Sequence, residues 1–225
     1  MIADGGYAAY FDGQNATLTN RGKIISGEGI RFVEAGTGTG RVINHGLISG
    51  GGTEMSDLQK VVVRNFGMID APHDDAVRGN DLRDVVINEG CMIGSVDLQA
   101  GNDLYNGRGG LVFGTILGNA GNDRFILGSG IKTIDGGTEN DTLDFRNGGG
   151  VKVSLDGGFV NVGRAAKGDV YAGIENIFGS WTGADSLDGD VGANDLRGFG
   201  GKDTIDGGSG DDTITGGAGV DTIST

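Results

Sequence analysis

The chain has 225 residues, of which 49 are glycine and one is proline, and its formal net charge is −14. Glycine makes up about 7% of an average protein, and a single proline excludes collagen and proline-rich linkers. Nucleic acid is excluded as a partner, because binding to phosphates needs a basic face. One cysteine, Cys91, permits no internal disulfide, and no apolar run reaches the ~18 residues of a membrane span.

Aspartate supplies 25 of the 31 acidic residues and glutamate only 6. A surface of solubilising helices would favour glutamate and lysine. Aspartate beside glycine indicates turns instead, and the binding of hard cations by short carboxylates. No helical period of 3.6 residues is sustained along the chain, so an α-rich fold is disfavoured.

Residues 1–97 carry a repeat of the form Asn-x-Gly-x-Ile. It begins at Asn20, Asn44 and Asn65, with a weaker fourth copy at Asn88, so the spacings are 24, 21 and 23 residues. A period near 22 with short β-branched runs and glycine turns is typical of a parallel β-helix coil, in which equivalent positions stack about 4.8 Å apart. We expect the asparagines to form an internal ladder, each amide bonding the next.

Residues 180–225 divide into consecutive nonapeptides, and a second block of them lies within residues 98–144. Asp103 marks an outlying copy. Residues 145–179 are less regular, and we expect β spacer coils there that bind no metal, with strands at Val151–Leu155 and Phe159–Val162. The nonapeptides begin at Ser180, Gly189, Gly198, Gly207 and Gly216, and in the earlier block at Gly118, Leu127 and Gly136.

Each nonapeptide combines a glycine-rich turn with a short strand whose middle side chain points inward. Two of them make one 18-residue coil, so turns two repeats apart lie directly above one another. Sixth-position carboxylates and loop carbonyls then converge, and two carboxylates with about four carbonyls match the oxygen shell of Ca²⁺. Mg²⁺ prefers to keep its waters, and no Cys/His cluster is present for zinc.

The predicted calcium ligands fall at the first, third and sixth positions of the repeats. We expect sixth positions to pair across 18 residues, Asp123 with Asp141, Asp185 with Asp203, Asp203 with Asp221, and Asn194 with Asp212. Lys132 and Asn194 stand where aspartate is expected, so their half-sites should be weak or absent. The predicted ligands are Asp103, Gly118, Ala120, Asp123, Gly136, Thr138, Asp141, Ser180, Thr182, Asp185, Asn194, Gly198, Gly200, Asp203, Gly207, Ser209, Asp212, Gly216, Ala218 and Asp221.

These patterns predict an all-β fold, an elongated β-solenoid in which a right-handed parallel β-helix continues into a calcium-binding parallel β-roll. The β-helix covers residues 1–97, the first repeat block 98–144, the irregular spacer 145–179 and the C-terminal roll 180–225. Stacked aspartates repel one another, so folding of the C-terminal end should depend on several bound Ca²⁺ ions.

The two blocks resemble the repeats-in-toxin (RTX), or haemolysin-type, calcium-binding nonapeptide, G-G-x-G-x-D-x-U-x. The resemblance covers about residues 98–224. It implies a bacterial protein that a type I secretion machinery exports without a Sec signal peptide. Such a protein folds outside the cell or at its surface, where calcium is plentiful. The sequence does not identify a target surface or polysaccharide.

An enzymatic role has less support. No H-E-x-x-H or G-x-S-x-G motif is present, and no catalytic residues are predicted. The one acid/base cluster is Asp70–Asp75, which includes His73 and resembles, in a different order, the Asp-Pro-His motif of mannuronan epimerases. A stabilising, adhesion or export module is therefore favoured. The alternative is the C-terminal or accessory part of a secreted polysaccharide-acting enzyme, such as a mannuronan C5-epimerase or lyase.

Overall fold

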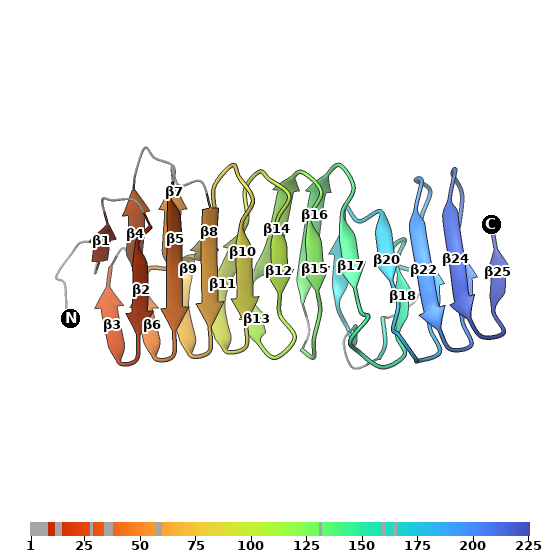
Figure 1. The fold of residues 1–225 in the computed structure, drawn as a ribbon, viewed down its shortest axis with the longest axis horizontal. Coiled ribbons are helices and arrows are strands. Elements are labelled where there is room, and N and C mark those ends of the chain that lie inside the picture. The colour runs from red at the N-terminus through yellow and green to blue at the C-terminus, as the bar shows by residue number, and fades with distance from the viewer. Residues whose placement is uncertain are drawn as a thin grey trace.

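The chain forms an elongated β-solenoid whose coils succeed one another from the N-terminal to the C-terminal end (Figure 1). The computed structural model describes residues 9–11, 15–27, 29–33, 38–56, 60–130, 132–158, 161–163 and 166–225. These residues form strands and no helix, so none could span a membrane as a helix. All pairings between named strands are parallel, which confirms the predicted all-β solenoid.

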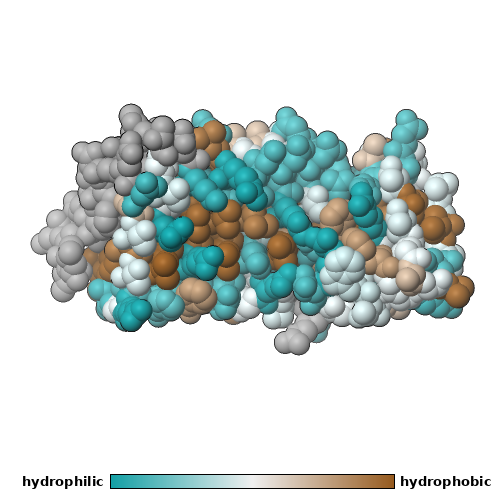
Figure 2. All heavy atoms as spheres, in the orientation of Figure 1, coloured by the Kyte–Doolittle hydropathy of each residue, from teal (hydrophilic) through white to brown (hydrophobic). Residues whose placement is uncertain are grey.

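A ten-stranded sheet runs along the whole molecule and contributes one strand to each coil. It faces the viewer in Figure 1, and Figure 2 shows hydrophobic residues gathered over its N-terminal half between hydrophilic rims. Its strands are β2 (Thr17–Asn20), β5 (Thr39–Asn44), β8 (Lys60–Asn65), β10 (Val85–Asn88), β12 (Leu104–Asn106), β15 (Arg124–Ile126), β17 (Thr142–Asp144), β20 (Asn176–Phe178), β22 (Asp195–Gly200) and β24 (Thr213–Ala218).

An eleven-stranded sheet packs against the N-terminal and central part of the ten-stranded sheet. Its strands are β1 (Ala9–Phe11), β3 (Lys23–Ser26), β4 (Ile30–Val33), β6 (Leu47–Gly50), β7 (Thr53–Ser56), β9 (Met68–Arg78), β11 (Cys91–Asp97), β13 (Leu111–Phe113), β14 (Thr115–Ala120), β16 (Thr133–Thr138) and β19 (Val170–Ala172). A four-stranded sheet takes its place at the C-terminal end, with strands β18 (Lys152–Ser154), β21 (Ser186–Asp188), β23 (Thr204–Asp206) and β25 (Thr222–Ser224).

Apolar side chains that point inward fill the narrow space between the sheets, and each three-residue nonapeptide strand supplies one of them from its middle position. Phe125, Leu143, Leu196 and Ile205 are fully buried middle residues, as the alternation predicted. Ile223, in the last strand β25, is 50% exposed. The core is therefore a single apolar column, thin but continuous.

The register of the coils follows the sequence spacings. Thr115 pairs with Thr133 and Thr204 with Thr222, which confirms the 18-residue coil of the nonapeptides. In the spacer, β19 and β20 extend the two large sheets, while β18 begins the four-stranded sheet. Of the expected strand Phe159–Val162, residues 159 and 160 lie outside the described residues, and Val162 forms an isolated antiparallel bridge with Lys152.

The asparagine ladder forms as predicted. The Nδ2 groups of Asn20, Asn44 and Asn65 donate to the Oδ1 atoms of Asn44, Asn65 and Asn88 at 2.8, 2.8 and 2.9 Å. Each asparagine ends a strand of the ten-stranded sheet, at the turns that leave this sheet, which we call the second edge. The loops that lead into the ten-stranded sheet form the first edge.

Candidate metal sites

A column of acidic side chains follows the first edge, one residue before successive strands of the ten-stranded sheet. The backbone N–H groups of Asp84, Asp103 and Asp123 each donate to an Oδ1 atom in the next coil, that of Asp103, Asp123 and Asp141, all at 2.7 Å. Asp141 N–H donates in the same way to Glu175 Oε2 at 2.8 Å. Asp103, inferred as an outlying copy, thus lies in the same column as Asp123 and Asp141.

The column continues into the C-terminal roll. The Nδ2 group of Asn194 donates to the Glu175 carbonyl at 3.1 Å, and Asn194 N–H donates to Asp212 Oδ1 at 3.0 Å. The first edge therefore carries one polar column from Asp84 to Asp212, which passes through the spacer without a break.

A second acidic column lies on the second edge of the C-terminal roll. Asp185 N–H donates to Asp203 Oδ1 at 2.9 Å, and Asp203 N–H donates to Asp221 Oδ1 at 3.0 Å. The structure thus brings together each pair that the 18-residue spacing predicted.

Four carboxylates in these columns keep a bare oxygen. Among the described residues, the Oδ2 atoms of Asp103, Asp123, Asp141 and Asp203 are buried without a hydrogen-bond partner. The four residues are at most 2% exposed. Leaving a buried charged oxygen unpaired is costly, and native proteins rarely do so without an ion, a water or another partner at the position. These four atoms are therefore the buried oxygens of the columns that lack a partner within the described residues.

First-position glycines of several repeats explain how oxygens converge there. A Cβ atom on Gly118 would overlap both Asp123 Oδ2 and the carbonyl oxygen of Gly136 in the next loop. A Cβ atom on Gly198 would likewise overlap Asp203 Oδ2 and the Gly216 carbonyl oxygen. Only glycine leaves room for a carboxylate and a carbonyl to meet, which is the donor set that Ca²⁺ accepts.

Other predicted ligands differ in their surroundings. Asp185 Oδ2 accepts hydrogen bonds from Ser180 N–H and Oγ at 2.7 and 3.1 Å, so its own loop already satisfies it. Asn194 Oδ1 accepts from Asp190 N–H at 2.9 Å. Asp212 and Asp221 are only partly buried, in the last coil. Of the other predicted ligands, Ala120, Thr138, Gly200 and Ala218 end strands β14, β16, β22 and β24, and Thr182, Gly207 and Ser209 lie in the connections between strands.

Burial raises the pKa of three carboxylates of the first-edge column that have a bare oxygen. It raises the pKa of Asp103 to about 8, of Asp141 to about 7 and of Asp123 to about 6, with neighbouring acids adding to the effect. Without a cation, Asp103 therefore holds its proton at neutral pH and Asp141 is partly protonated, whereas Asp123 is protonated only at slightly acidic pH. A divalent ion would favour the ionised form and displace the protons.

Sequence reasoning missed two members of the first column. Asp84 is fully buried, and both its oxygens are satisfied, by Val61 N–H at 3.1 Å and Asn80 N–H at 2.8 Å. Gly79, Asp84 and the buried Val86 do occupy the first, sixth and eighth positions of a nonapeptide, so a looser pattern would have found this copy. Glu175 stands on a short loop, and its 34-residue separation from Asp141 offered no such signal.

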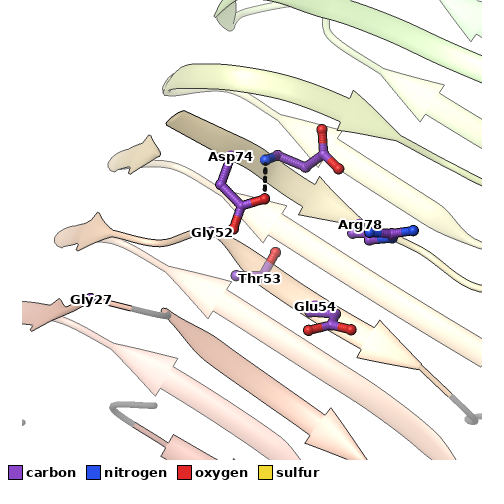
Figure 3. A pocket seen from close by; sticks show the side chains of 7 residues that line it. Gly27, Gly52, Thr53, Glu54, Asp74 and Arg78 are labelled. Atoms are coloured by element: carbon purple, nitrogen blue, oxygen red, sulfur yellow. Dashed lines mark hydrogen bonds between the residues drawn. The ribbon is translucent and has the colours of Figure 1, made fainter. Parts of the chain in front are cut away.

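The acid/base cluster lies apart from these columns, on the eleven-stranded sheet. Asp74 and Asp75 line a pocket of about 220 Å³ together with Glu54 and Arg78, and Figure 3 shows Thr53 and Glu54 beside Asp74 in this pocket. A neighbouring groove of about 570 Å³ also contains His73. Burial, followed by the charges of Asp97 and Asp74, raises the pKa of Asp75.

The family model of the RTX calcium-binding nonapeptide repeat (4 copies) matches residues 115–131, 182–214 and 197–225. No curated protein matches the chain. The chain therefore carries RTX calcium-binding repeats, as the resemblance predicted, in the coils that hold Asp123 and Asp203. In the described residues no three His, Cys, Asp or Glu side chains form a group that could hold a metal ion by themselves.

Proposed function

We propose that this chain is a secreted, non-catalytic calcium-binding module whose C-terminal coils fold with calcium outside the cell. The observation that carries the proposal is the set of four buried, bare Oδ2 atoms of Asp103, Asp123, Asp141 and Asp203. Two of them lie together with a backbone carbonyl around a first-position glycine, Gly118 or Gly198, within the residues that the RTX family model matches. Calcium accepts such mixed carboxylate and carbonyl shells, whereas Mg²⁺ dehydrates reluctantly.

Export by a type I machinery follows from the same reasoning. Sites that are needed for folding would stay empty where calcium is scarce, so the C-terminal coils would remain unfolded inside the cell and fold after export. The module would then serve as a stabilising, adhesion or export element.

The Asp141 site extends this proposal into the spacer. A Cβ atom on Gly136 would overlap Asp141 Oδ2 and the Gly173 carbonyl oxygen, which repeats the arrangement seen at Gly118. Glu175 then takes the part of the sixth-position aspartate in the next coil. Asp141, Gly173 and Glu175 would hold an ion that joins the two repeat blocks.

Calcium titration of the full chain tests the proposal. We expect several ions by native mass spectrometry, a gain of β signal by circular dichroism on addition of calcium after EGTA, and no comparable gain with magnesium. Asp123→Asn should lose calcium, while the exposed Asp211→Asn serves as the matched control. A chain that takes up no calcium at millimolar concentration would refute the proposal.

One observation favours the alternative, a polysaccharide-acting enzyme or its accessory part. The groove beside His73 contains Asp74, Asp75 and the exposed Phe113, which is a combination of acids and an apolar surface that a sugar chain could use. Alginate, pectin and similar uronates are the substrates to screen, with NMR to detect epimerisation. Turnover that His73→Ala abolishes would establish the alternative.

A further inference from the structure

Lys132 occupies the sixth position of the Leu127–Lys132 loop, on the second edge, where an RTX repeat would carry aspartate. It is only 2% exposed. Its Nζ atom donates to the carbonyl oxygens of Gly128, Ser129 and Gly130 at 2.9, 3.2 and 2.8 Å. An ammonium group has three donors, and this loop offers one carbonyl to each.

The next coil supplies an acidic residue opposite Lys132, as the acidic columns do for each of their members. Lys132 N–H donates to Asp169 Oδ1 at 2.9 Å, which is the same bond that joins Asp123 to Asp141. Asp169 is 4% exposed, and its other oxygen accepts from the Tyr171 hydroxyl at 3.1 Å. The loop therefore has the carbonyls and the facing carboxylate of a cation site.

We propose that the Lys132 ammonium is the built-in cation of this coil. It binds the loop carbonyls that would otherwise face a metal ion. Its positive charge also balances the negative charge of Asp169, whereas buried carboxylates of the acidic columns have an oxygen without a partner. This loop then holds its shape without calcium and takes up none while Lys132 is present. The second edge of the neighbouring spacer coil is therefore ordered even when no metal is bound.

Removing the ammonium tests the structural part of the inference. Lys132→Met keeps the length of the side chain but leaves three carbonyls without a donor. We expect it to lower the melting temperature in EGTA by roughly 5 °C, with little change in the exposed Lys202→Met control. Equal melting temperatures for the two variants would overturn the inference.

Amine labelling of the native wild-type chain gives a readout that needs no variant. Reductive methylation in EGTA should modify Lys132 at least about tenfold more slowly than Lys202, because a buried ammonium reacts only when the loop opens. Labelling of both lysines at the same rate would contradict a buried, carbonyl-bound amine.

Lys132→Asp tests whether the loop is a cation site, and this arm rests on the proposed function. The introduced aspartate would face Asp169 as Asp123 faces Asp141, so native mass spectrometry should count one more calcium ion than in wild type. No added ion, in a variant that still binds the other ions, would overturn the inference. If the wild type itself binds no calcium, the proposed function fails, and Lys132→Met with the labelling decides this inference alone.

Discussion

The asparagine ladder and the acidic columns both stack polar side chains from successive coils, but they differ in how the hydrogen-bonding groups of these side chains are satisfied. In the ladder, Asn44 donates to Asn65 Oδ1 and to the Met68 carbonyl, while its own Oδ1 accepts from Asn20. An amide both donates and accepts, so a stack of amides satisfies itself. A carboxylate only accepts, and in the column Asp123 uses one oxygen and leaves the other bare. A ladder of carboxylates is complete only with protons or a cation.

The largest expected effect follows removal of calcium. In EGTA, peptides that contain the column carboxylates C-terminal of β12 should lose protection in hydrogen exchange by more than about tenfold, because these carboxylates are left stacked without a cation, whereas the Lys132 loop should keep its protection. The coils around Asn44 and Asn65 should keep their protection. Loss of protection in both regions together would show that the asparagine ladder and the acidic columns do not differ in their dependence on calcium.

A break in the ladder should have a large effect that calcium does not change. Asn65→Ala removes the ladder donor of Asn88 Oδ1 and the ladder acceptor of the Asn44 Nδ2 group, so two buried hydrogen bonds between coils are lost. We expect a loss of about 3 kcal/mol, or roughly 6 to 12 °C in melting temperature. The half-buried Asn106→Ala is the control. A loss that appeared only in calcium would contradict the self-sufficiency of the ladder.

Two aspartates of the second edge should differ in their effect on calcium binding. Asp203 has a bare Oδ2 atom, whereas Ser180 satisfies that of Asp185. Asp203→Asn should therefore lose at least one ion in native mass spectra, and more calcium than Asp221→Ala loses. Asp185→Asn should stay close to wild type. Equal losses at Asp203 and Asp185 would show that the bare oxygen does not mark the stronger site.

The calcium-free chain should lose stability as the pH rises. The pKa values of Asp84 and Asp141 are raised to about 7 and that of Asp103 to about 8, so the folded state binds protons more tightly than the unfolded state. This stabilisation is complete below the unfolded pKa and disappears as the pH passes through the folded pKa. In EGTA the melting temperature should fall from about pH 5 to about pH 9, and calcium should flatten the curve. A melting temperature that rises with pH in EGTA would be the opposite result.

The smallest expected effect concerns the junction between the repeat blocks. Glu175→Gln keeps an acceptor for Asp141 N–H but removes a negative charge beside the Asp141 carboxylate. One calcium site should weaken severalfold in a titration, with the other sites unchanged. An unchanged titration would remove Glu175 from the ligands without affecting the Asp203 sites.

The sequence predicted what depends on strict periodicity and missed what depends on loop length. The ladder from Asn20 to Asn88 and the pairing of Asp123 with Asp141 follow directly from residue spacing. Glu175 was not found, because a shortened loop moves the acid out of register and a longer side chain restores the contact. The contacts of Lys132 could not be predicted either, since they depend on how the ammonium folds back onto its own loop.

Strand β10 connects the first-edge acidic column with the asparagine ladder, because Asp84 precedes it on the first edge and Asn88 ends it on the second edge. On the N-terminal side of β10, asparagine side chains link successive coils, and on its C-terminal side mainly carboxylate side chains do so. This gives the solenoid a mechanical direction. If a calcium-free chain is pulled from its ends, the coils of the C-terminal roll should unfold at low force, and the amide-bonded coils should resist longest. The calcium concentration would then determine how many coils of the solenoid resist a pulling force.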